Sequence, residues 1–378
     1  MVKALKAMYS TVKSCVRYNH SQSDFFESHV GLKQGDPSSP LLFMFFVNDL
    51  MNNINSDLND IFTIEEMKLF LLLYADDQAV FARSPDSLQK LLNDIENYCN
   101  AWGLRINTAK TKIMIFEKGR LTHHDFYLYG SSLEVVNSFK YLGVSLYRNG
   151  NWYRSQKDIA KHASYALNGL FQIFKSIELP NSQKCKLFDA LVSSILHFGG
   201  ELIGSYPCTD LELVHTKFLR RILLVKRSTN TAALYGELGR VPLVIIRKVR
   251  MIKYWLKILK SPHDSLIYKT YEMLRLDANA SRSYNGRNWA FQIKQLLQEH
   301  GFSNVWDSNV HEGINFLMIR QRIFDMYHQQ WYASINNSSK LKTYSVFKHD
   351  FNFESYLDNI AIPKFRIALS KFRVSIFT

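Results

Sequence analysis

The sequence predicts an α+β unit over residues 1–150 followed by a mostly α-helical region. Two observations lead to this fold class. Short apolar runs separated by turn signals dominate before residue 150, whereas beyond Trp152 nearly every segment places apolar residues three and four apart. The charge changes at the same place: residues 1–150 carry 15 Lys and Arg against 16 Asp and Glu, and residues 151–378 carry 32 against 17.

Because composition and charge change together, we expect a domain boundary near residue 150. Residues 1–150 form the first predicted domain, residues 151–260 a basic helical region, and residues 261–378 a further helical region whose completeness the sequence leaves open. The basic excess suits a polyanion, since cations that neutralise phosphates gain from counterion release. Solvated helix faces explain the same charges equally well on composition alone.

The first elements are read from spacing and capping residues. Residues 1–20 have a helical spacing of apolar side chains that extends to Val12 and Val16. Residues 24–36, DFFESHVGLKQGD, are predicted to form a short strand that ends in a glycine turn. Residues 38–54, SSPLLFMFFVNDLMNNI, then predict a helix capped by Ser38 or Ser39, with Pro40 in its first turn. Its apolar run is nearly continuous, so we expect burial on most sides.

Two strand-like runs flank a pair of acids in residues 65–82, EEMKLFLLLYADDQAVFA. This pattern predicts a hairpin with Asp76 and Asp77 at its tip. Charge is costly within an apolar segment unless it is paired, solvated or bound to a metal. The acids therefore belong either to a solvated turn or to a functional site.

Residues 84–103, SPDSLQKLLNDIENYCNAWG, give the clearest helix, with Ser84 as cap, Pro85 in the first turn and Gly103 as stop. Its apolar stripe predicts that it lies across a sheet. Short strands are expected at 112–116, 126–130, 133–136 and 139–146, the last closed by the turn signal Asn149 and Gly150. Helices are expected over 151–176, 182–199, 210–227 and 243–261.

Composition also excludes some classes of protein. The chain has 378 residues, 47% of them hydrophobic, which is enough for a substantial core. Its four cysteines are far apart and form no CxxC pair, so neither a disulfide framework nor a structural zinc site is indicated. The longest apolar runs fall short of the roughly 20 residues that cross a bilayer, and no signal peptide is visible. We expect an intracellular protein, nuclear or cytoplasmic, without a membrane partner.

Four motifs occur in a fixed order before the basic region: GLKQGDPSSPLLF from Gly31, YADD from Tyr74, GLRINTAKTKIMIF from Gly103 and FKYLGVSL from Phe139. In this order and spacing the chain resembles the reverse transcriptases of non-LTR, LINE-like retrotransposons. The resemblance implies a polymerase palm, an antiparallel sheet with packed helices, followed by a helical thumb. It also implies RNA-directed DNA polymerase activity by two-metal nucleotidyl transfer onto a primer 3′ end. The implied partners are an RNA template, a DNA primer and deoxynucleoside triphosphates; the oligomeric state stays open.

The resemblance also assigns roles to residues at the matching positions. Asp76 would be a ligand of catalytic Mg²⁺ with Asp77 beside it, which agrees with the preference of Mg²⁺ for carboxylates and substrate phosphates. The remaining roles would fall to a nucleotide and template site at Gln34, Gly35 and Pro40, a triphosphate contact at Lys110 or Lys112, and a primer grip at Tyr141, Leu142 and Gly143. Each of these positions also has a purely structural explanation. Gly35 could be a turn glycine, the two lysines could be solvated, and residues 141–143 could be an ordinary strand end.

In the thumb-like region, the resemblance and the charge excess together predict contacts with the nucleic-acid backbone. Cations there would touch phosphates without reading bases, so binding would be salt-dependent and largely indifferent to sequence. The predicted phosphate ligands are Lys217, Arg220, Arg221, Lys226 and Arg227, and the basic run continues through Arg240, Arg247, Lys248, Arg250 and Lys253.

The chain departs from the family in one respect that bears on activity. The family carries a further metal-binding aspartate well upstream of the glycine loop, and Asp24 lies too close to that loop to replace it. The chain therefore looks truncated at both ends, with an incomplete ligand set for its two metal ions. We expect little or no polymerase activity from it alone. The alternatives are a catalytically inactive nucleic-acid-binding relic and a purely structural protein.

Overall fold

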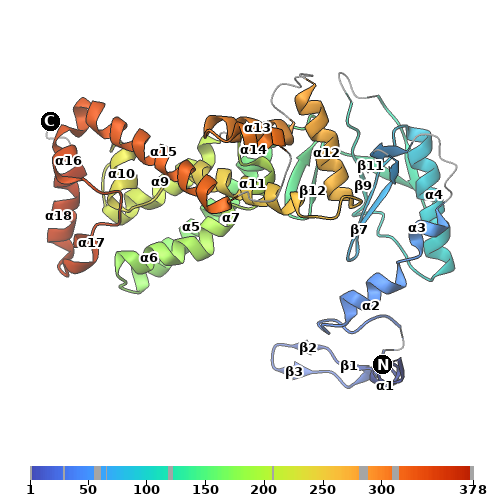
Figure 1. The fold of residues 1–378 in the computed structure, drawn as a ribbon. Coiled ribbons are helices and arrows are strands. Elements are labelled where there is room, and N and C mark those ends of the chain that lie inside the picture. Colours follow the sequence, from blue (N-terminus) through green and yellow to red (C-terminus); the bar gives the residue numbers. More distant parts are fainter. Residues whose placement is uncertain are drawn as a thin grey trace. The chain divides into compact units, whose positions relative to one another are not determined.

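The computed structural model describes residues 2–28, 30–54, 61–64, 66–117, 122–206, 208–280, 288–308 and 315–374. The chain divides into two compact units, shown in Figure 1. Unit 1 is Met1–Thr111 with His124–Glu134, and unit 2 is Lys112–His123 with Val135–Thr378. These units are grouped by contact alone, so the predicted domains 1–150, 151–260 and 261–378 stay predictions.

Unit 1 begins with helix α1 (Val2–Tyr9), which is shorter than its apolar spacing predicts. Val12 and Val16 lie outside it, and β-branched residues of this kind lose side-chain freedom in a helix. Two small antiparallel pairs follow instead: β1 (Lys13–Ser14) with β4 (Phe26–Glu27), and β2 (Arg17–Tyr18) with β3 (Ser21–Gln22). The strand predicted within residues 24–36 is thus only the two residues of β4.

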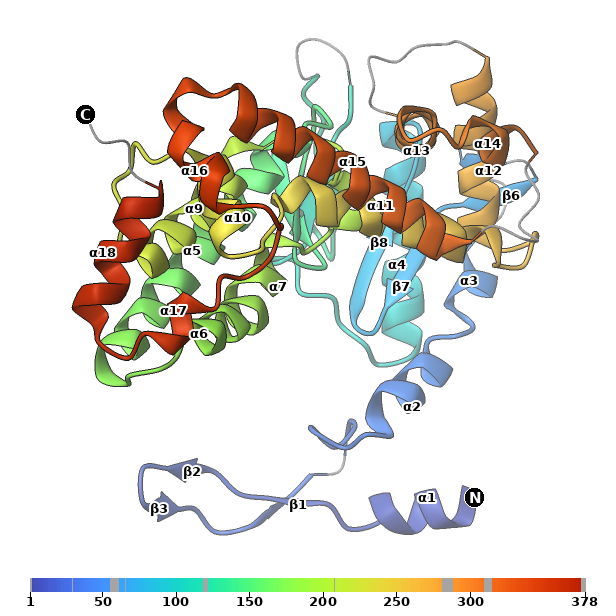
Figure 2. The ribbon, with the colours of Figure 1, turned by 60° about the vertical axis from the view of Figure 1, so that its left-hand side comes forward.

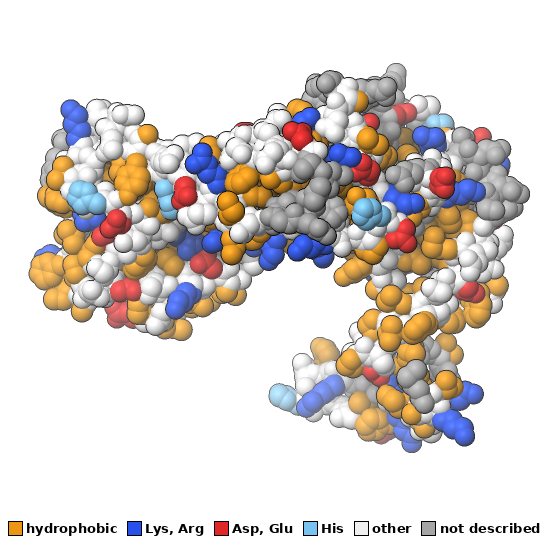
Figure 3. All heavy atoms as spheres, viewed as in Figure 1, with side chains coloured by type: hydrophobic (Ala, Val, Ile, Leu, Met, Phe, Trp, Pro, Cys, Tyr) orange, Lys and Arg blue, Asp and Glu red, His pale blue; other side chains and the backbone are white. Residues whose placement is uncertain are grey.

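The helix predicted over residues 38–54 is two helices, α2 (Ser39–Phe46) and α3 (Leu50–Asn53). The expectation that it is buried on most sides is wrong for α2: none of its residues is buried, and Phe45 is 70% exposed. Figure 3 shows hydrophobic side chains along this helix. An all-apolar helix is buried only if other elements surround it, and the described core of unit 1 takes residues from α3 but none from α2.

The predicted hairpin is present. Strand β7 (Leu71–Tyr74) pairs with β8 (Asp77–Val80) in antiparallel register, and β5 (Phe62–Ile64) pairs with β6 (Met67–Leu69) just before it. Leu71 is buried in the same cluster as Leu50 of α3, whereas the tip of β7–β8 is exposed. The hairpin therefore joins the core at its base and presents its turn to solvent.

Helix α4 (Pro85–Ala101) has the predicted start and stop. The Ser84 hydroxyl accepts a hydrogen bond from the Ser87 amide, and Gly103 follows the helix with φ +66°. The predicted apolar stripe is largely confirmed, since its buried members join the core of unit 1: Leu91, Ile95, Tyr98 and Cys99.

The strand pair β10 (Phe126–Leu128) and β11 (Ser131–Val135) lies against α4. Gln89 of α4 both donates to the Tyr127 carbonyl and accepts from its amide, at 2.9 Å each. Glu96 accepts from the Tyr129 amide at 2.7 Å. These strands and the two-residue β9 (Lys112–Ile113) lie where the sequence predicts them, and α4 crosses the strands as expected.

In unit 2 the segment predicted as one strand over 139–146 is a hairpin of β12 (Ser138–Tyr141) and β13 (Val144–Tyr147). Its two turn residues, Leu142 and Gly143, have φ of +46° and +84°. Positive φ at both central residues is typical of a tight hairpin turn that matches the twist of its strands. Gly143 supplies this conformation without strain, which the apolar pattern of the segment does not reveal.

The helices predicted after residue 150 are present, so the chain is of the α+β class with small antiparallel sheets followed by helices. One of them, over 182–199, is interrupted by a π-helical turn (Asp189–Ser193) between α6 and α7. Such turns are rare in α-helices. The bounds are α5 (Trp152–Ser176), α6 (Asn181–Phe188), α7 (Ser194–Leu196), α8 (Gly200–Ile203), α9 (Thr209–Leu223), α10 (Thr231–Glu237) and α11 (Leu243–Leu259).

Further helices complete unit 2, and the long α15 runs beside α10 and α11 (Figures 1 and 2). A second core forms around Trp255, whose indole donates to the Tyr271 hydroxyl at 3.0 Å. None of the helices in the described ranges is long and apolar enough to cross a membrane. The bounds are α12 (Leu266–Asn279), α13 (Trp289–Glu299), α14 (Ser303–Ser308), α15 (Phe316–Asn337), the 3₁₀ turn Ser339–Leu341, α16 (Lys342–Phe347), α17 (Tyr356–Asn359) and α18 (Pro363–Val374).

Candidate functional sites

The β7–β8 hairpin of unit 1 carries both predicted catalytic acids. Tyr74 pairs with Asp77, which leaves Ala75 and Asp76 as a two-residue turn. Ala75 has φ +53°, a conformation that costs a residue with a Cβ roughly 1–2 kcal/mol. Asp76 and Asp77 are both exposed, and neither carboxylate makes a hydrogen bond or ion pair with another described residue. Positive φ is common in tight hairpin turns, and residues held in such strained conformations also cluster at functional sites.

The donor chemistry of this turn suits a hard divalent cation in part. Two adjacent carboxylates provide the oxygen ligands that such ions prefer. Within the ranges that the structure describes, however, no group of three or more His, Cys, Asp and Glu side chains is gathered in a way that could hold a metal. Asp76 and Asp77 thus offer two candidate ligands and not a complete set.

The loop before α2 presents Gln34 and Gly35 at an exposed turn. Asp36 closes this turn by accepting from the amide and the hydroxyl of Ser38, both at 2.8 Å, and these bonds lower the pKa of Asp36. Ser38 occupies the predicted cap position but makes no capping bond to the helix. Pro40 lies in the first turn of α2 as expected, and Gly35 has φ +83° with open space around it.

Two of the predicted triphosphate ligands follow α4. Lys110 is exposed and ends a turn in which its amide bonds to Asn107. Lys112 is partly buried and begins β9. Among the described residues, Lys110 makes no hydrogen bond or ion pair with the acidic hairpin, and both lysine assignments stay predictions.

The predicted primer grip is the β12–β13 turn, and it is anchored within unit 2. The Tyr147 hydroxyl donates to Asp158 of α5 at 2.8 Å, and the Ser155 hydroxyl of α5 donates to the Ser145 carbonyl. A Cβ added to Gly143 would lie 3.0 Å from the Phe198 ring, so the turn packs closely on the segment between α7 and α8. These contacts fix the turn on a rigid helix, as a gripping element requires.

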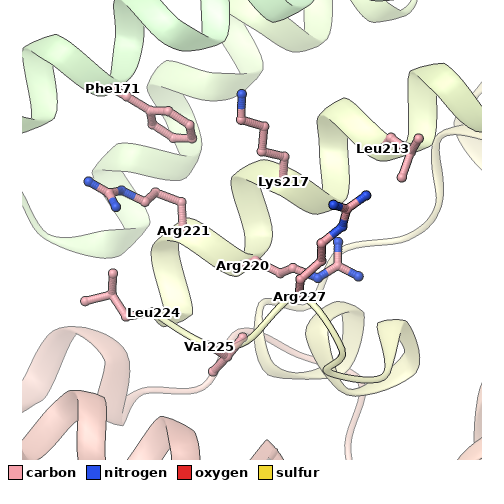
Figure 4. Close-up of a pocket in the computed structure, with 8 residues that line it drawn as sticks. All are labelled: Phe171, Leu213, Lys217, Arg220, Arg221, Leu224, Val225 and Arg227. Atoms are coloured by element: carbon pink, nitrogen blue, oxygen red, sulfur yellow. The ribbon is translucent and has the colours of Figure 1, made fainter.

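Four of the five predicted phosphate ligands line one pocket, which we call the cationic pocket (Figure 4). It has a volume of about 750 Å³. Lys226, the fifth, is not part of the lining. The cations of the pocket are Lys217, Arg220, Arg221 and Arg227, and its apolar residues are Phe171, Leu213, Leu224 and Val225.

No carboxylate of the described residues pairs with any of these four cations. Lys217 instead donates to the Asn168 amide oxygen at 3.1 Å, and the Arg221 guanidinium lies 5.9 Å from the centre of the Phe171 ring. Burial lowers the pKa of Arg220, and the positive charge of Arg227 lowers it further. The Nε of Arg220 is buried without a hydrogen-bond partner in the described chain. The pocket is therefore a region of uncompensated positive charge.

Several cations in the predicted continuation of the basic run are engaged within the fold. Arg240 pairs with Asp189, and Lys248 pairs with Glu299 at 3.1 Å. Arg247 is only 2% exposed, and burial lowers its pKa to about 10. Arg250 donates to the His197 carbonyl at 3.4 Å but is exposed, as Lys253 is. A charge count cannot tell a cation that stabilises the fold from one that is available to a ligand.

The apolar part of the pocket was not predicted. Leu213 and Leu224 share one face of α9 with Lys217 and Arg221, so helical spacing could have grouped these four. Phe171 comes from α5, and only the packing of α5 against α9 brings it to the pocket. No sequence signal gives that contact.

Comparison with known proteins relates the N-terminal part of the chain to a known family. Residues 2–146 match the family model described as reverse transcriptase (RNA-dependent DNA polymerase). This stretch contains the acidic hairpin, the glycine loop and nearly all of the β12–β13 hairpin. The N-terminal part of the chain is therefore similar to reverse transcriptases.

The relatives are products of transposable elements. The chain is 24% identical over 319 residues to the RNA-directed DNA polymerase from mobile element jockey of Drosophila funebris, covering 81% of this chain and 33% of the relative. It is 29% identical over 138 residues to the retrovirus-related Pol polyprotein from type-2 retrotransposable element R2DM of Drosophila melanogaster, covering 34% and 13%. A putative uncharacterized transposon-derived protein of Caenorhabditis elegans is 30% identical over 186 residues, covering 47% and 64%.

The predicted resemblance to retrotransposon reverse transcriptases is thus confirmed. The chain spans about a third of the length of the jockey polymerase that it matches.

Proposed function

We propose that the chain is part of an RNA-directed DNA polymerase of a retrotransposon, with Asp76 and Asp77 as ligands of catalytic Mg²⁺. The position of both acids at the exposed turn of β7–β8, inside the stretch that matches the reverse transcriptase family, carries this proposal. Successive strand residues point to opposite faces, so two neighbouring acids can serve one ion only at a turn. When bound, Mg²⁺ would activate the primer hydroxyl and stabilise the leaving pyrophosphate.

The other predicted residues would take the remaining roles of such a polymerase. The exposed Gln34 and Gly35 would let backbone approach the template and the incoming nucleotide, with Pro40 fixing the helix that follows. Lys110 or Lys112 would offset triphosphate charge, and the turn of Tyr141, Leu142 and Gly143 would hold the primer end. The cations of α9 would contact the nucleic-acid backbone.

The second candidate is nucleic-acid binding without catalysis. The described residues favour it in one respect, because they bring only two carboxylates to the hairpin. The names of the relatives favour the polymerase, since those from jockey are RNA-directed DNA polymerases. We therefore keep the polymerase as the proposed function and expect a low rate from the two-carboxylate site.

Primer extension on an RNA template with Mg²⁺ distinguishes the two candidates. We expect slow, template-dependent extension that is lost in Asp76→Asn and in Asp77→Asn. The matched control is Asp24→Asn, an exposed aspartate outside the hairpin, which should leave the rate unchanged. Primer–template binding without any extension would overturn the polymerase in favour of the second candidate.

Metal binding at the hairpin can be tested without turnover. Tyr74 pairs with Asp77 and is 64% exposed, so it lies close enough to excite a Tb³⁺ ion bound by the acids. Terbium luminescence excited through tyrosine should fall in Asp76→Asn and in Tyr74→Phe, and Mg²⁺ should compete with it. Equal luminescence in all variants would place the bound ion elsewhere.

A further inference from the structure

We propose that the cationic pocket takes an unpaired base of single-stranded nucleic acid, with the phosphates on either side of that base held by Lys217, Arg220, Arg221 and Arg227. This deepens the proposed nucleic-acid partner and rests on it to that extent. It goes beyond backbone contact, because it assigns the apolar half of the pocket to a base and thereby separates single strands from duplexes.

The four positive charges of the pocket match more than one phosphate group. Four cations line it and no described carboxylate neutralises them. Arg220 and Arg227 act on each other as like charges, and Figure 4 shows their side chains running beside one another. A single phosphate would leave most of this charge uncompensated, whereas consecutive phosphates of one strand would neutralise it.

The apolar residues of the pocket favour a ligand that includes a nucleobase. Leu213 is 56% exposed and Leu224 is 41% exposed, and the Phe171 ring also lines the pocket. Phosphate alone would leave these side chains in water. A base that stacks on an aromatic ring is favoured by roughly 1–3 kcal/mol, independently of its identity. In a duplex the bases are already stacked and paired, so a duplex can offer only its phosphates to this site.

The size and backbone of the pocket agree with this ligand. Its volume of about 750 Å³ falls in the usual range for small-ligand sites, which is roughly 300–1,000 Å³. Leu224 has φ +53° and ends α9 in the left-handed conformation. The chain therefore turns sharply there, and Arg227 returns to the pocket instead of continuing along the helix axis. A left-handed residue is a common way for a helix to end.

Fluorescence anisotropy with the full chain tests the proposal. The probes are a labelled 12-nucleotide single strand and a blunt duplex of the same length. Phe171→Leu should weaken single-strand binding about tenfold and leave duplex binding unchanged. The matched control is Tyr165→Leu, an aromatic residue of α5 that is 63% exposed and lies outside the pocket; it should change neither affinity.

The cations give a second, independent measurement that does not depend on folding of the Phe171 variant. Arg221→Gln should weaken binding of the single strand and reduce the slope of log affinity against log salt by about 0.7, the value for one phosphate contact. Lys161→Gln, an exposed lysine of α5 outside the pocket, should leave the slope unchanged. A mononucleotide should displace the labelled strand at a lower concentration than inorganic phosphate does.

Two results would overturn the proposal. The first is an equal loss of single-strand and duplex affinity in Phe171→Leu, which would mean that the pocket holds phosphates without a base. The second is an unchanged salt slope in Arg221→Gln. Failure of the proposed polymerase is separate from either: Asp76→Asn should abolish extension while single-strand binding persists, because the hairpin is not part of the pocket.

Discussion

Arg373 of α18 binds Glu237 of α10 across 136 residues of sequence. Its guanidinium donates from Nη2 to Oε1 at 2.9 Å and from Nε to both carboxylate oxygens at 3.1 Å. The Glu237 side chain is completely buried, and the Tyr356 hydroxyl donates to it at 2.6 Å. This ion pair therefore joins the last described helix to the centre of unit 2.

Arg373→Met should strongly destabilise unit 2. Removing one partner of a buried pair leaves the other charge uncompensated, which costs about 3 kcal/mol in the free energy of unfolding. The measurement is urea unfolding followed by circular dichroism. Lys364→Met is the control, since Lys364 is an exposed residue of the same helix. An equal effect of both substitutions would show that the pair contributes nothing beyond the helix itself.

Glu212 should make stability fall in acid. Burial alone would raise its pKa, but hydrogen bonds from His215, Tyr235 and the Leu243 amide outweigh burial and hold the pKa below its usual 4.5. A carboxylate whose pKa is lowered by folding contributes its full stability above the pKa of the unfolded chain and loses it as the pH falls through the lowered pKa of the folded chain.

The free energy of unfolding, measured in urea from pH 6 to pH 3, should therefore decline more gently in Glu212→Gln than in the unsubstituted chain. Identical slopes below pH 4.5 would contradict the assigned pKa.

Replacing Leu224 by glycine should destabilise the chain less than replacing it by alanine. Both substitutions remove the same apolar contacts, but only glycine adopts φ +53° without a steric penalty. Leu224→Gly should therefore be about 1 kcal/mol more stable than Leu224→Ala in thermal or urea unfolding. If the alanine variant were at least as stable, α9 would not end in the left-handed conformation.

Gly143→Ala should loosen the β12–β13 turn. The added methyl group would meet the Phe198 ring at 3.0 Å, and the residue has φ +84°. We expect a loss of about 2 kcal/mol in the free energy of unfolding, from strain and overpacking together. Gly150→Ala is the matched control, with φ +64° but open space around it, and should cost about 1 kcal/mol. Replacing the ring in Phe198→Leu should reduce the difference in the free energy of unfolding between Gly143→Ala and Gly150→Ala. An unchanged difference would argue against the contact between residue 143 and the Phe198 ring.

Much of the fold follows from local pattern. Helix α4 has its cap, its apolar stripe and its glycine stop where the sequence places them, because each of these signals acts within a few residues. The Asp76 turn follows for the same reason, since two apolar strands must reverse between them. The catalytic roles of Asp76 and Asp77, by contrast, come from the resemblance and stay predictions.

The features that were missed depend on contacts between distant residues. The exposure of α2 depends on which elements surround it, and the sequence of the helix does not indicate this. Arg247 and Arg240 looked like free cations until packing buried the first and paired the second. Phe171 reaches the cationic pocket only because α5 packs on α9, 46 residues before Lys217 in the sequence.

The π-helical turn at Asp189–Ser193 has a consequence for how this chain is aligned with its relatives. A π turn holds an extra residue over the length of an ordinary α-helical turn. A relative that lacks it would align with a one-residue gap in the middle of a helix, where gaps are normally penalised as errors. That gap would be correct, and moving it into a neighbouring loop would shift every position between Asp189 and the loop by one residue.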